Sequence, residues 1–323
     1  MNVFLTFDIE VWCPSWENLD ENFPSAFQRY VYGRSKFGAY ALPKTLDILV
    51  KHGLHGVFFV EPLFAARFGL EYLARIVELI QSAGQEIQLH LHPEWVDEIK
   101  PPLLPNSSRK RQHLSYYDLN EQTELIANGV RLLKQAGVPS LQAFRAGSFA
   151  ANSDTFAALE ANGILFDSSL NAAVPISAPD IQRNEPAFSP RLIGNVSAYP
   201  VTVFRDGLGK LRHAQIGACS SWELQEALRY GERNEMEAFV LFSHNFEMLK
   251  PSRSDPDWIV VKRFQQFCRF LSNNPSLRPV GFRDLRPIKT NVQGSEAIAR
   301  SGLLATSFRL FEQGLRNSLA RLS

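Results

Sequence analysis

Short apolar runs alternate along the chain with longer stretches in which apolar residues recur every three or four positions. Such runs, bounded by glycine or polar residues, indicate buried strands, and the wider spacing indicates helices. The predicted strands are 3–8, 56–60, 86–91, 142–145, 164–167, 197–203, 238–243 and 280–282. The predicted helices are 43–52, 71–83, 118–137, 152–162, 221–230 and 257–273.

Strands and helices in regular alternation favour an α/β fold with a parallel sheet and helical crossovers. About seven such units over residues 1–287 suit a closed or nearly closed barrel better than an open sheet. Residues 288–323 are expected to form a linker and a C-terminal helix outside this barrel.

The C-terminal segment has the pattern of an amphipathic helix. From Leu304 onward, its apolar positions step by three or four, while arginines occupy other faces. The apolar positions are Phe308, Phe311, Leu315, Leu319 and Leu322, and the arginines are Arg309, Arg316 and Arg321. We expect this helix to dock on the barrel or on a protein partner, with peripheral membrane contact as an alternative.

Composition limits the classes of partner and the compartment. A formal net charge of +1 over 323 residues gives no field that would favour nucleic acid. The three cysteines, Cys13, Cys219 and Cys268, are too few for a disulfide framework and fit a reducing compartment. The N-terminus lacks a signal-peptide pattern and no window is long and apolar enough to span a bilayer, so a cytoplasmic protein is expected.

Candidate chemistry begins with two pairs of residues at predicted strand ends. His90 and His92 end strand 86–91, and Asp8 and Glu10 end strand 3–8. Residues i and i+2 of an extended chain point to the same face, so each pair leaves the backbone side by side. Two histidines and a carboxylate can hold a catalytic metal, and the second carboxylate is then free for base chemistry.

Six polar residues follow predicted strands in the same manner: Asp8, His90, His92, Arg145, Asp167 and His244. In parallel α/β folds the carboxyl ends of the strands form the rim on which active sites are built. We therefore expect these side chains to share one barrel mouth.

The order of these motifs resembles that of the polysaccharide deacetylases, carbohydrate esterase family four, also called the NodB-homology domain. The matching segments are 6–10 (TFDIE), 58–60 (FFV), 86–93 (EIQLHLHP), 144–148 (FRAGS), 166–169 (FDSS) and 241–244 (LFSH). The resemblance covers residues 1–287 and implies a distorted (β/α)7 barrel. It also implies metal-dependent removal of an acetyl group from an N-acetylated sugar.

The resemblance assigns a role to each rim residue. It implies that Asp8 is the general base and His244 the general acid. It implies that the metal ligands are Glu10, His90 and His92. Arg145 would brace the base, and Asp167 would orient His244.

Three departures from the family pattern bear on the substrate more than on the reaction. Ile9 separates the two acids, which are usually adjacent. The metal histidines are two apart rather than four, with Gln88 at the position four before His92. The usual Arg-x-Pro-Tyr becomes Arg-Ala-Gly-Ser over 145–148.

The expected cofactor is one divalent metal ion, and zinc suits two histidines with one carboxylate. A backbone N–H near Ser148 could act as a second oxyanion donor if the family geometry holds. Trp12 and Trp16 could stack on a sugar ring or pack in the core. The basic run 109–111 is either a solvated loop or a reader of phosphate on a lipid- or nucleotide-linked sugar. Cys13 lacks an evident base, so a core thiol is expected.

The sequence hypothesis is a cytoplasmic, metal-dependent deacetylase that acts on an acetylated sugar or glycan, with possible membrane or protein contact through its C-terminal helix. One alternative is a hydrolase of another amide or of an O-acetyl ester with the same site. The other alternative is a metal-free barrel that binds a glycan or a protein partner.

Overall fold

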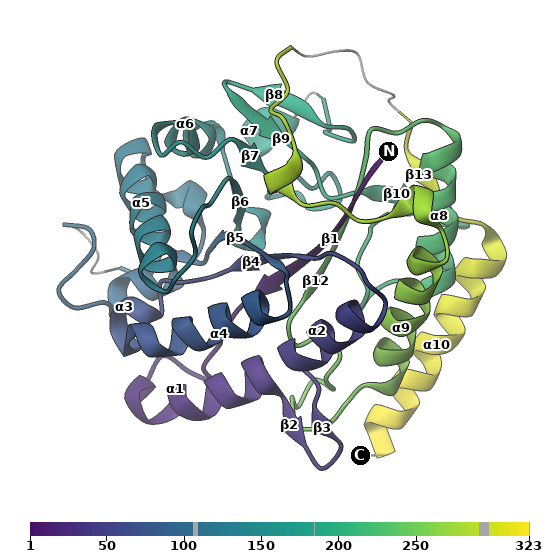
Figure 1. Ribbon diagram of the computed structural model, residues 1–323, viewed down its shortest axis with the longest axis horizontal. Helices are drawn as coiled ribbons and strands as arrows, with labels where there is room; N and C mark the ends of the chain where they lie inside the picture. The colour runs from purple at the N-terminus through teal and green to yellow at the C-terminus, as the bar shows by residue number, and fades with distance from the viewer. Residues whose placement is uncertain (106–108, 184, 291–296, 323) are drawn as a thin grey trace.

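The computed structural model describes residues 1–105, 109–183, 185–290 and 297–322, with side chains as far as Ser318. At its centre lies a curled sheet surrounded by helices (Figure 1). The described part of this sheet has the strand order β12-β1-β4-β5-β6-β7-β9-β8, and only the β8–β9 pair is antiparallel. All the strands of this sheet except β8 therefore run parallel, which confirms the expected α/β barrel-like fold.

The strands of the central sheet are β1 (Asn2–Ile9), β4 (Val57–Val60), β5 (Glu86–Leu91), β6 (Ala143–Ala146), β7 (Phe166–Asp167), β8 (Arg191–Ile193), β9 (Val196–Ala198) and β12 (Ala238–His244). The smaller sheets contain β2 (Arg34–Ser35) with β3 (Gly38–Ala39), and β10 (Val203–Arg205) with β11 (Leu211–His213) and β13 (Ala299–Arg300). The prediction missed β2, β3, β8, β11 and β13, which have too few residues to show a period, and it included only the first residue of β10.

The α-helices are α1 (Leu19–Phe27), α2 (Leu42–Lys51), α3 (Ala65–Phe68), α4 (Leu70–Ser82), α5 (Leu119–Gln135), α6 (Ser153–Ala161), α7 (Pro179–Gln182), α8 (Ser221–Arg233), α9 (Trp258–Ser272) and α10 (Leu303–Leu322). A π-helical turn, η1 (Gln28–Tyr32), follows α1. Short 3-10 turns are η2 (Pro93–Glu98), η3 (Leu114–Tyr116), η4 (Gly147–Phe149), η5 (Pro275–Leu277) and η6 (Phe282–Asp284).

Side-chain caps fix where the crossover helices begin. The Asp118 carboxylate accepts a hydrogen bond from the Glu121 backbone N–H at 2.9 Å, and the Glu121 carboxylate accepts one from the Asp118 backbone N–H at 3.1 Å. Asn152 forms the same reciprocal arrangement with Thr155. These bonds satisfy backbone donors that have no partner inside the helix, so α5 and α6 begin where the sequence predicts.

Alternation along the strands decides which side chains enter the barrel. On β1, Leu5 and Phe7 belong to the large core between sheet and helices, whereas Phe4 belongs to a smaller core inside the barrel. Val240 and Phe242 of β12 lie in the same inner core. Since every second residue faces the same way, the inward register continues to the polar residues at the carboxyl end of each strand.

The predicted last strand, 280–282, is wrong. The Val280 N–H donates to the Val3 carbonyl at 2.9 Å, but the chain then turns into η6. The Phe282 ring stacks on Phe4 at 4.8 Å between centroids and joins the inner core. The Phe282 side chain therefore closes the amino-terminal end of the barrel. Apolar patterning cannot distinguish a short segment of this kind from a strand.

The predicted strand 197–203 is also wrong as a single element. It divides into β9 and β10 around Pro200, because proline has no backbone N–H to donate to a neighbouring strand. Between the two strands, the Thr202 N–H donates to the Val240 carbonyl at 3.0 Å, and its hydroxyl accepts from the Val240 N–H at 2.8 Å. Thr202 therefore links the segment after β9 to β12, and the curled sheet nearly closes.

The C-terminal helix forms as predicted, and it docks on α8 and α9 (Figure 1). Polar side chains make this contact, and Leu304, Phe308, Phe311 and Leu315 of the apolar stripe are exposed. Leu319 and Leu322 of that stripe lie outside the described side chains. The domain boundary at residue 287 stays a prediction. Among the described residues, none of the helices has the length and apolarity required to cross a bilayer.

Candidate metal centre

Parallel pairing brings the expected rim residues together. In the register of the sheet, Asp8 lies beside His244, and His90 lies beside Arg145. Because all these strands run in one direction, their carboxyl ends open on the same mouth.

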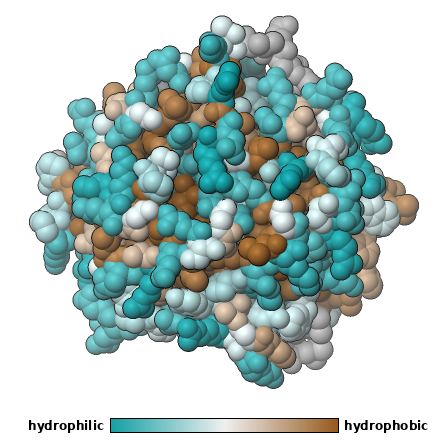
Figure 2. Space-filling model, viewed as in Figure 1, coloured by the Kyte–Doolittle hydropathy of each residue, from teal (hydrophilic) through white to brown (hydrophobic). Residues whose placement is uncertain are grey.

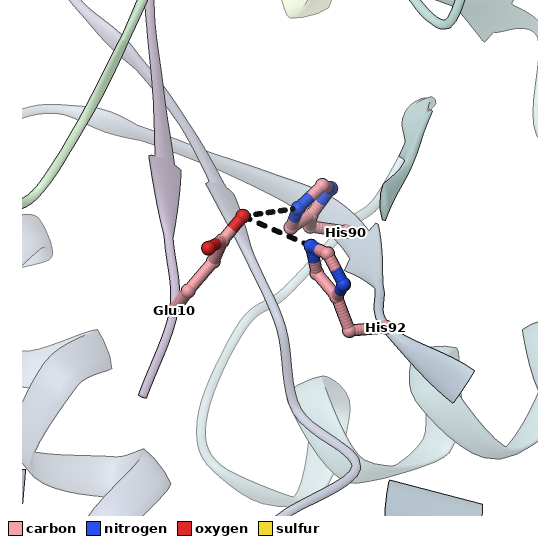
Figure 3. A group of neighbouring side chains, drawn as sticks. All are labelled: Glu10, His90 and His92. Carbon is pink, nitrogen blue, oxygen red and sulfur yellow. Dashed lines mark hydrogen bonds and ion pairs between the residues drawn. The ribbon is translucent and has the colours of Figure 1, made fainter. Parts of the chain in front are cut away.

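Glu10, His90 and His92 converge at this mouth, as Figure 3 shows. The Glu10 Oε1 atom lies 3.1 Å from His90 Nε2 and 2.9 Å from His92 Nε2. Ligand atoms about 2.0–2.2 Å from a tetrahedral zinc ion lie ~3.3 Å from one another. The three side chains therefore already have a spacing that fits one ion.

Hydrogen bonds behind the two rings turn the correct nitrogens toward Glu10. His90 Nδ1 lies 2.7 Å from the Arg145 carbonyl, which can only accept, so Nδ1 donates there and Nε2 is the nitrogen that faces Glu10. His92 Nδ1 lies 3.2 Å from the Glu94 carboxylate. Metal-binding histidines usually have such a partner on the far nitrogen, and the donor set fits a divalent cation.

The electrostatics of the cluster suit a cation at its centre. Burial would raise the pKa of Glu10. The charges of His92 and His244, together with hydrogen bonds from His90 and His92, instead hold this pKa well below its usual value. Burial would lower the pKa of His92, but Glu10 and Glu94 raise it well above the usual range. A proton on His92 and a divalent ion would therefore compete for the same position beside Glu10.

Asp8 lies next to this ligand set and is held by Arg145. The Arg145 guanidinium donates from Nη1 to Asp8 Oδ1 at 2.7 Å, and both side chains are buried. Ser168 fixes the arginine further, since its carbonyl and hydroxyl accept from Nε and Nη2 at 3.1 and 2.9 Å. The arrangement matches the bracing that the resemblance implies.

His244 has a different carboxylate partner from the expected one. Its Nδ1 lies 2.9 Å from Glu247 Oε1, and its Nε2 lies 3.9 Å from Glu10 Oε1. The Glu247 carboxylate also accepts from the Gly217 N–H at 2.7 Å and from the Ser243 hydroxyl at 3.0 Å. Glu247 is thus fixed by several donors and sets the orientation of the His244 ring.

The expected role of Asp167 as the residue that orients His244 is corrected by this geometry. Asp167 accepts from the Ser169 N–H and hydroxyl at 2.8 and 2.6 Å. Its neighbour Phe166 lies in the inner core, so strand alternation turns Asp167 to the opposite face. Burial raises the pKa of Asp167 to about 6 although Ser169 lowers it, and the residue anchors the backbone after β7.

The ligand set opens into a pocket of about 680 Å³. Its described lining includes Asp8, Glu10, Trp12, Cys13, Trp16, His90, His92, Glu94, Lys110, Ser148 and His244. Trp12 donates from its indole N–H to Glu10 Oε2 at 2.7 Å, and Trp16 lies edge-on to Trp12. Burial raises the pKa of the Cys13 thiol to about 11, which disfavours a nucleophilic thiolate.

Gly147 explains one departure from the family pattern. A Cβ atom at this position would lie 2.6 Å from His92 Nδ1, closer than side chains tolerate. Ser148 and Phe149, which follow it, have left-handed φ values of 54° and 58° and line the pocket. Strained backbone of this kind is often found at functional sites.

The basic run 109–111 lies partly at the pocket, but the charges of Lys110 and Arg111 are compensated. Lys110 Nζ lies 2.7 Å from Asp97 and 3.1 Å from Glu98, and it covers the Trp16 ring at 3.6 Å from the centroid. Arg111 pairs with Glu121 through both guanidinium ends. These contacts disfavour phosphate recognition by Lys110 and Arg111.

Sequence reasoning missed three residues of the site. Glu94 and Glu247 follow a rim histidine by two and three positions, and that spacing was the available signal. Asn245 left no such signal: its side chain accepts from the Glu10 N–H and donates to the Glu10 carbonyl, both at 3.1 Å. Asn245 thereby fixes the backbone of Glu10 across more than 200 positions of sequence. Gln88, in contrast, bonds to the backbone of Gln142 and Ala143, outside the site.

No protein-family model and no curated protein matches the chain. A candidate polysaccharide deacetylase from Mycobacterium smegmatis has a similar structure, with a TM-score of 0.52 and 19% sequence identity. The similarity covers 89% of this chain and 94% of the other. The chain has the polysaccharide-deacetylase fold.

A protein with a different activity shares this deacetylase fold. The 4-alpha-glucanotransferase from Thermococcus litoralis is similar with a TM-score of 0.51 and 10% identity, over 88% of this chain and 39% of the other. The fold therefore leaves the reaction open, and the residues of the site must decide it.

Zinc added to metal-free protein is expected to raise the melting temperature by several degrees. Zinc that binds only the folded state, at a free concentration a hundred-fold above Kd, stabilises the folded protein by about 2.7 kcal/mol. Differential scanning calorimetry measures the shift. Glu10→Gln should abolish it, whereas Glu78→Gln, an exposed acid on α4, should retain it. A full shift in the Glu10 variant would exclude Glu10 as a ligand.

Gly147→Ala is expected to weaken zinc binding by roughly 10- to 100-fold, because the new methyl group displaces His92 from its position beside Glu10. Isothermal titration with zinc measures the affinity. Gly314→Ala is the matched control, since a methyl group there meets open space. Unchanged affinity in the Gly147 variant would show that the His92 ring does not need this position.

Proposed function

We propose that this protein is a metal-dependent hydrolase that removes an acetyl group from an N-acetylated sugar in glycan or polysaccharide biosynthesis. One observation carries the proposal: a proton acceptor and a proton donor lie beside a three-residue ligand set in one pocket. Ligand atoms of Asp8, Glu10 and His244 lie within 4.8 Å of one another, and so do those of Glu10, His90 and His92. The deacetylase fold is consistent with this chemistry.

Glu10, His90 and His92 would hold the ion, and zinc fits this donor set best. A divalent ion there supplies Lewis-acid chemistry, polarising a carbonyl group and making water more acidic. Trp12 and Glu94 hold Glu10 and His92 in place through hydrogen bonds. Asn245 holds the Glu10 backbone.

Asp8 is the proposed general base. Its Oδ1 is occupied by the Arg145 guanidinium, which leaves Oδ2 for the proton of an attacking water molecule. The buried ion pair fixes the orientation of the carboxylate, which is one requirement of general base catalysis.

His244 is the proposed general acid. Burial would lower its pKa, but the charges of Glu10 and Glu247, with the hydrogen bond to Glu247, raise that pKa to about 9. The ring is therefore a cation at neutral pH. Since Glu247 takes Nδ1, the Nε2 proton is available for the leaving amine.

The pocket favours a sugar without phosphate near the acetyl group. Trp12 and Trp16 offer aromatic surface, and among the described lining residues Lys110 is the one lysine or arginine, already paired with two acids. A backbone N–H near Ser148 is proposed as an additional oxyanion donor. A lipid or nucleotide carrier would then extend away from the site, and a cytoplasmic location stays a prediction.

The purified protein, loaded with zinc, should release acetate from N-acetylglucosamine oligomers and lose this activity with a chelator. Asp8→Asn should bind zinc normally and reduce kcat by ~10²–10⁴-fold, as expected for removal of a general base. Acetate is measured by an enzyme-coupled assay, and an O-acetylated sugar is assayed in parallel to compare ester and amide. Undiminished turnover with chelator would reject the mechanism, and absence of zinc binding would favour a non-catalytic barrel.

The alkaline limb of the deacetylase pH profile should mark the pH at which His244 loses its proton. An ion bound by Glu10 offsets the carboxylate charge that contributes most to the raised His244 pKa, so the limb of the metal-loaded enzyme should lie below pH 9. Glu247→Gln removes one of the carboxylate charges that raise this pKa, so the limb should move to lower pH and kcat should fall by roughly 10²-fold. Asp167→Asn should leave the limb in place, because Asp167 does not contact His244. If Asp167→Asn moves the limb and Glu247→Gln does not, the assignment of Glu247 is wrong.

A further inference from the structure

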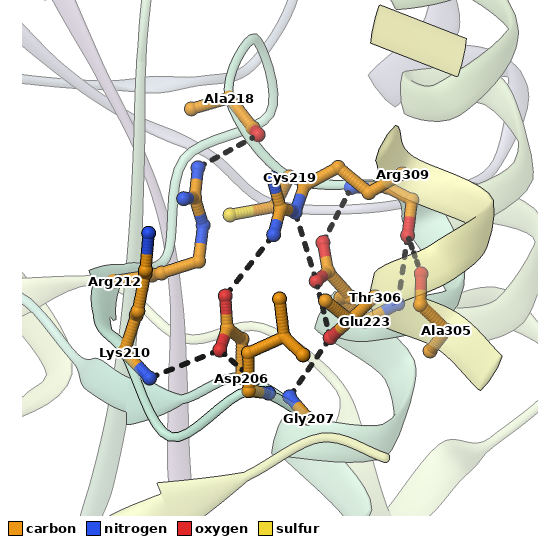
Figure 4. Close-up of polar contacts among 12 residues, drawn as sticks. Asp206, Gly207, Lys210, Arg212, Ala218, Cys219, Glu223, Ala305, Thr306 and Arg309 are labelled. Atoms are coloured by element: carbon orange, nitrogen blue, oxygen red, sulfur yellow. Dashed lines mark hydrogen bonds and ion pairs between the residues drawn. The ribbon is translucent and has the colours of Figure 1, made fainter. Parts of the chain in front are cut away.

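The C-terminal helix α10 turns charged side chains toward the protein. Arg309 is 4% exposed and donates to Asp206 at 3.0 Å and to Glu223 at 2.9 Å (Figure 4). The Thr306 hydroxyl donates to the same Glu223 oxygen at 3.0 Å. Buried charges without partners are costly, so this network fixes which face of α10 can dock.

The contact continues along the helix in the same polar manner. Arg263 of α9 donates to Glu312 at 2.9 Å, and Arg316 pairs with Asp257 at the start of α9. The docked face of α10 thus carries ion pairs over several turns. A helix that only covered the hydrophobic core would place its apolar residues here.

The apolar residues of α10 instead form a stripe on its solvent-exposed side. Leu304 is 72% exposed, Phe308 42%, Phe311 62% and Leu315 44%. These four residues, the outer ridge, step by four, three and four positions and therefore share one side of the helix. Apolar side chains reach the surface along the right-hand edge of Figure 2, where α10 lies in Figure 1. Soluble proteins rarely leave such a stripe uncovered.

The border of the outer ridge is aromatic and basic. The Trp222 ring, 41% exposed, lies 6.2 Å from the Phe308 ring. Phe308 and Trp222 line a shallow depression together with Gln266 and Arg269 of α9. Helical spacing places exposed Lys262 one turn from Gln266 in the same row.

Acidic charge near the ridge is compensated. Among the described side chains of α10, Glu312 is the sole acid, and Arg263 pairs with it. Exposed residues of α9 include Lys262 and Arg269 but no acid. On α8, Glu226 accepts from the Gly302 N–H at 2.6 Å at the start of α10, so the positive character lies on the α9 side of the ridge.

We infer that the outer ridge binds the surface of an anionic lipid bilayer, with the helix lying in the plane of the headgroups. Apolar side chains of Leu and Phe would enter the acyl boundary, Trp222 would lie at the interface, and Lys262 and Arg269 would contact anionic headgroups. A second copy of the chain is disfavoured, because a symmetric contact would set these cations against themselves. This inference goes beyond the deacetylase proposal and does not depend on it.

Vesicle flotation with the full-length protein tests the inference. At low salt, the protein should float with vesicles of phosphatidylcholine and phosphatidylglycerol, and binding should weaken as salt rises. The Leu304→Ser/Phe311→Ser variant should bind vesicles at least roughly ten-fold more weakly than the wild type, because it removes apolar side chains. The Lys262→Glu/Arg269→Glu variant should lose the preference for vesicles that contain phosphatidylglycerol over vesicles of phosphatidylcholine alone.

Leu119→Ser/Leu165→Ser is the matched control, because both leucines are about as exposed as Leu315 and lie on α5 and before β7. This control should bind like the wild type, and circular dichroism melts establish that all variants are folded. The inference fails if wild-type protein stays unbound at low salt, or if the ridge variant floats equally well. It also fails if sedimentation velocity shows a dimer that only the ridge variant disrupts, without vesicle binding.

Discussion

The close approach of one buried carboxylate to two imidazoles is the interaction on which the candidate site depends. Glu10, His90 and His92 are all nearly inaccessible to solvent, and their ligand atoms lie about as far apart as one ion requires. Such a concentration of polar groups is tolerated in a protein only when each group has a partner. The hydrogen bonds from Trp12 and Asn245 give the carboxylate and its backbone those partners.

The neighbouring catalytic candidates are arranged by the same rule of paired charges. Arg145 satisfies Asp8 on one side of the ligand set, and Glu247 satisfies His244 on the other. The first pair fixes the orientation of a carboxylate, and the second raises the pKa of an imidazole. A proton acceptor and a proton donor can therefore lie within a few ångströms of each other, which is the condition for cleaving an amide in one pocket.

The C-terminal helix shows how buried ion pairs determine orientation. Apolar patterning alone favours burial of the Phe308 and Phe311 stripe, yet Arg309 pairs with Asp206 and Glu223 beneath the helix. Removing one partner would leave a buried charge alone, so the polar face is the one that docks. The apolar face becomes available for binding, and the molecule gains a second surface far from the ligand set in sequence.

The order of most strands and helices and the two i, i+2 pairs at strand ends could be predicted from the chain, because periodicity and alternation are local properties. Those pairs predicted the ligand set Glu10, His90 and His92 before any distance was known. Three-dimensional packing was needed to show that Glu247 rather than Asp167 contacts His244, and that residues 280–282 insert a phenylalanine instead of a strand. Partners separated by long stretches of chain, or by the curvature of a sheet, depend on packing that no local pattern contains.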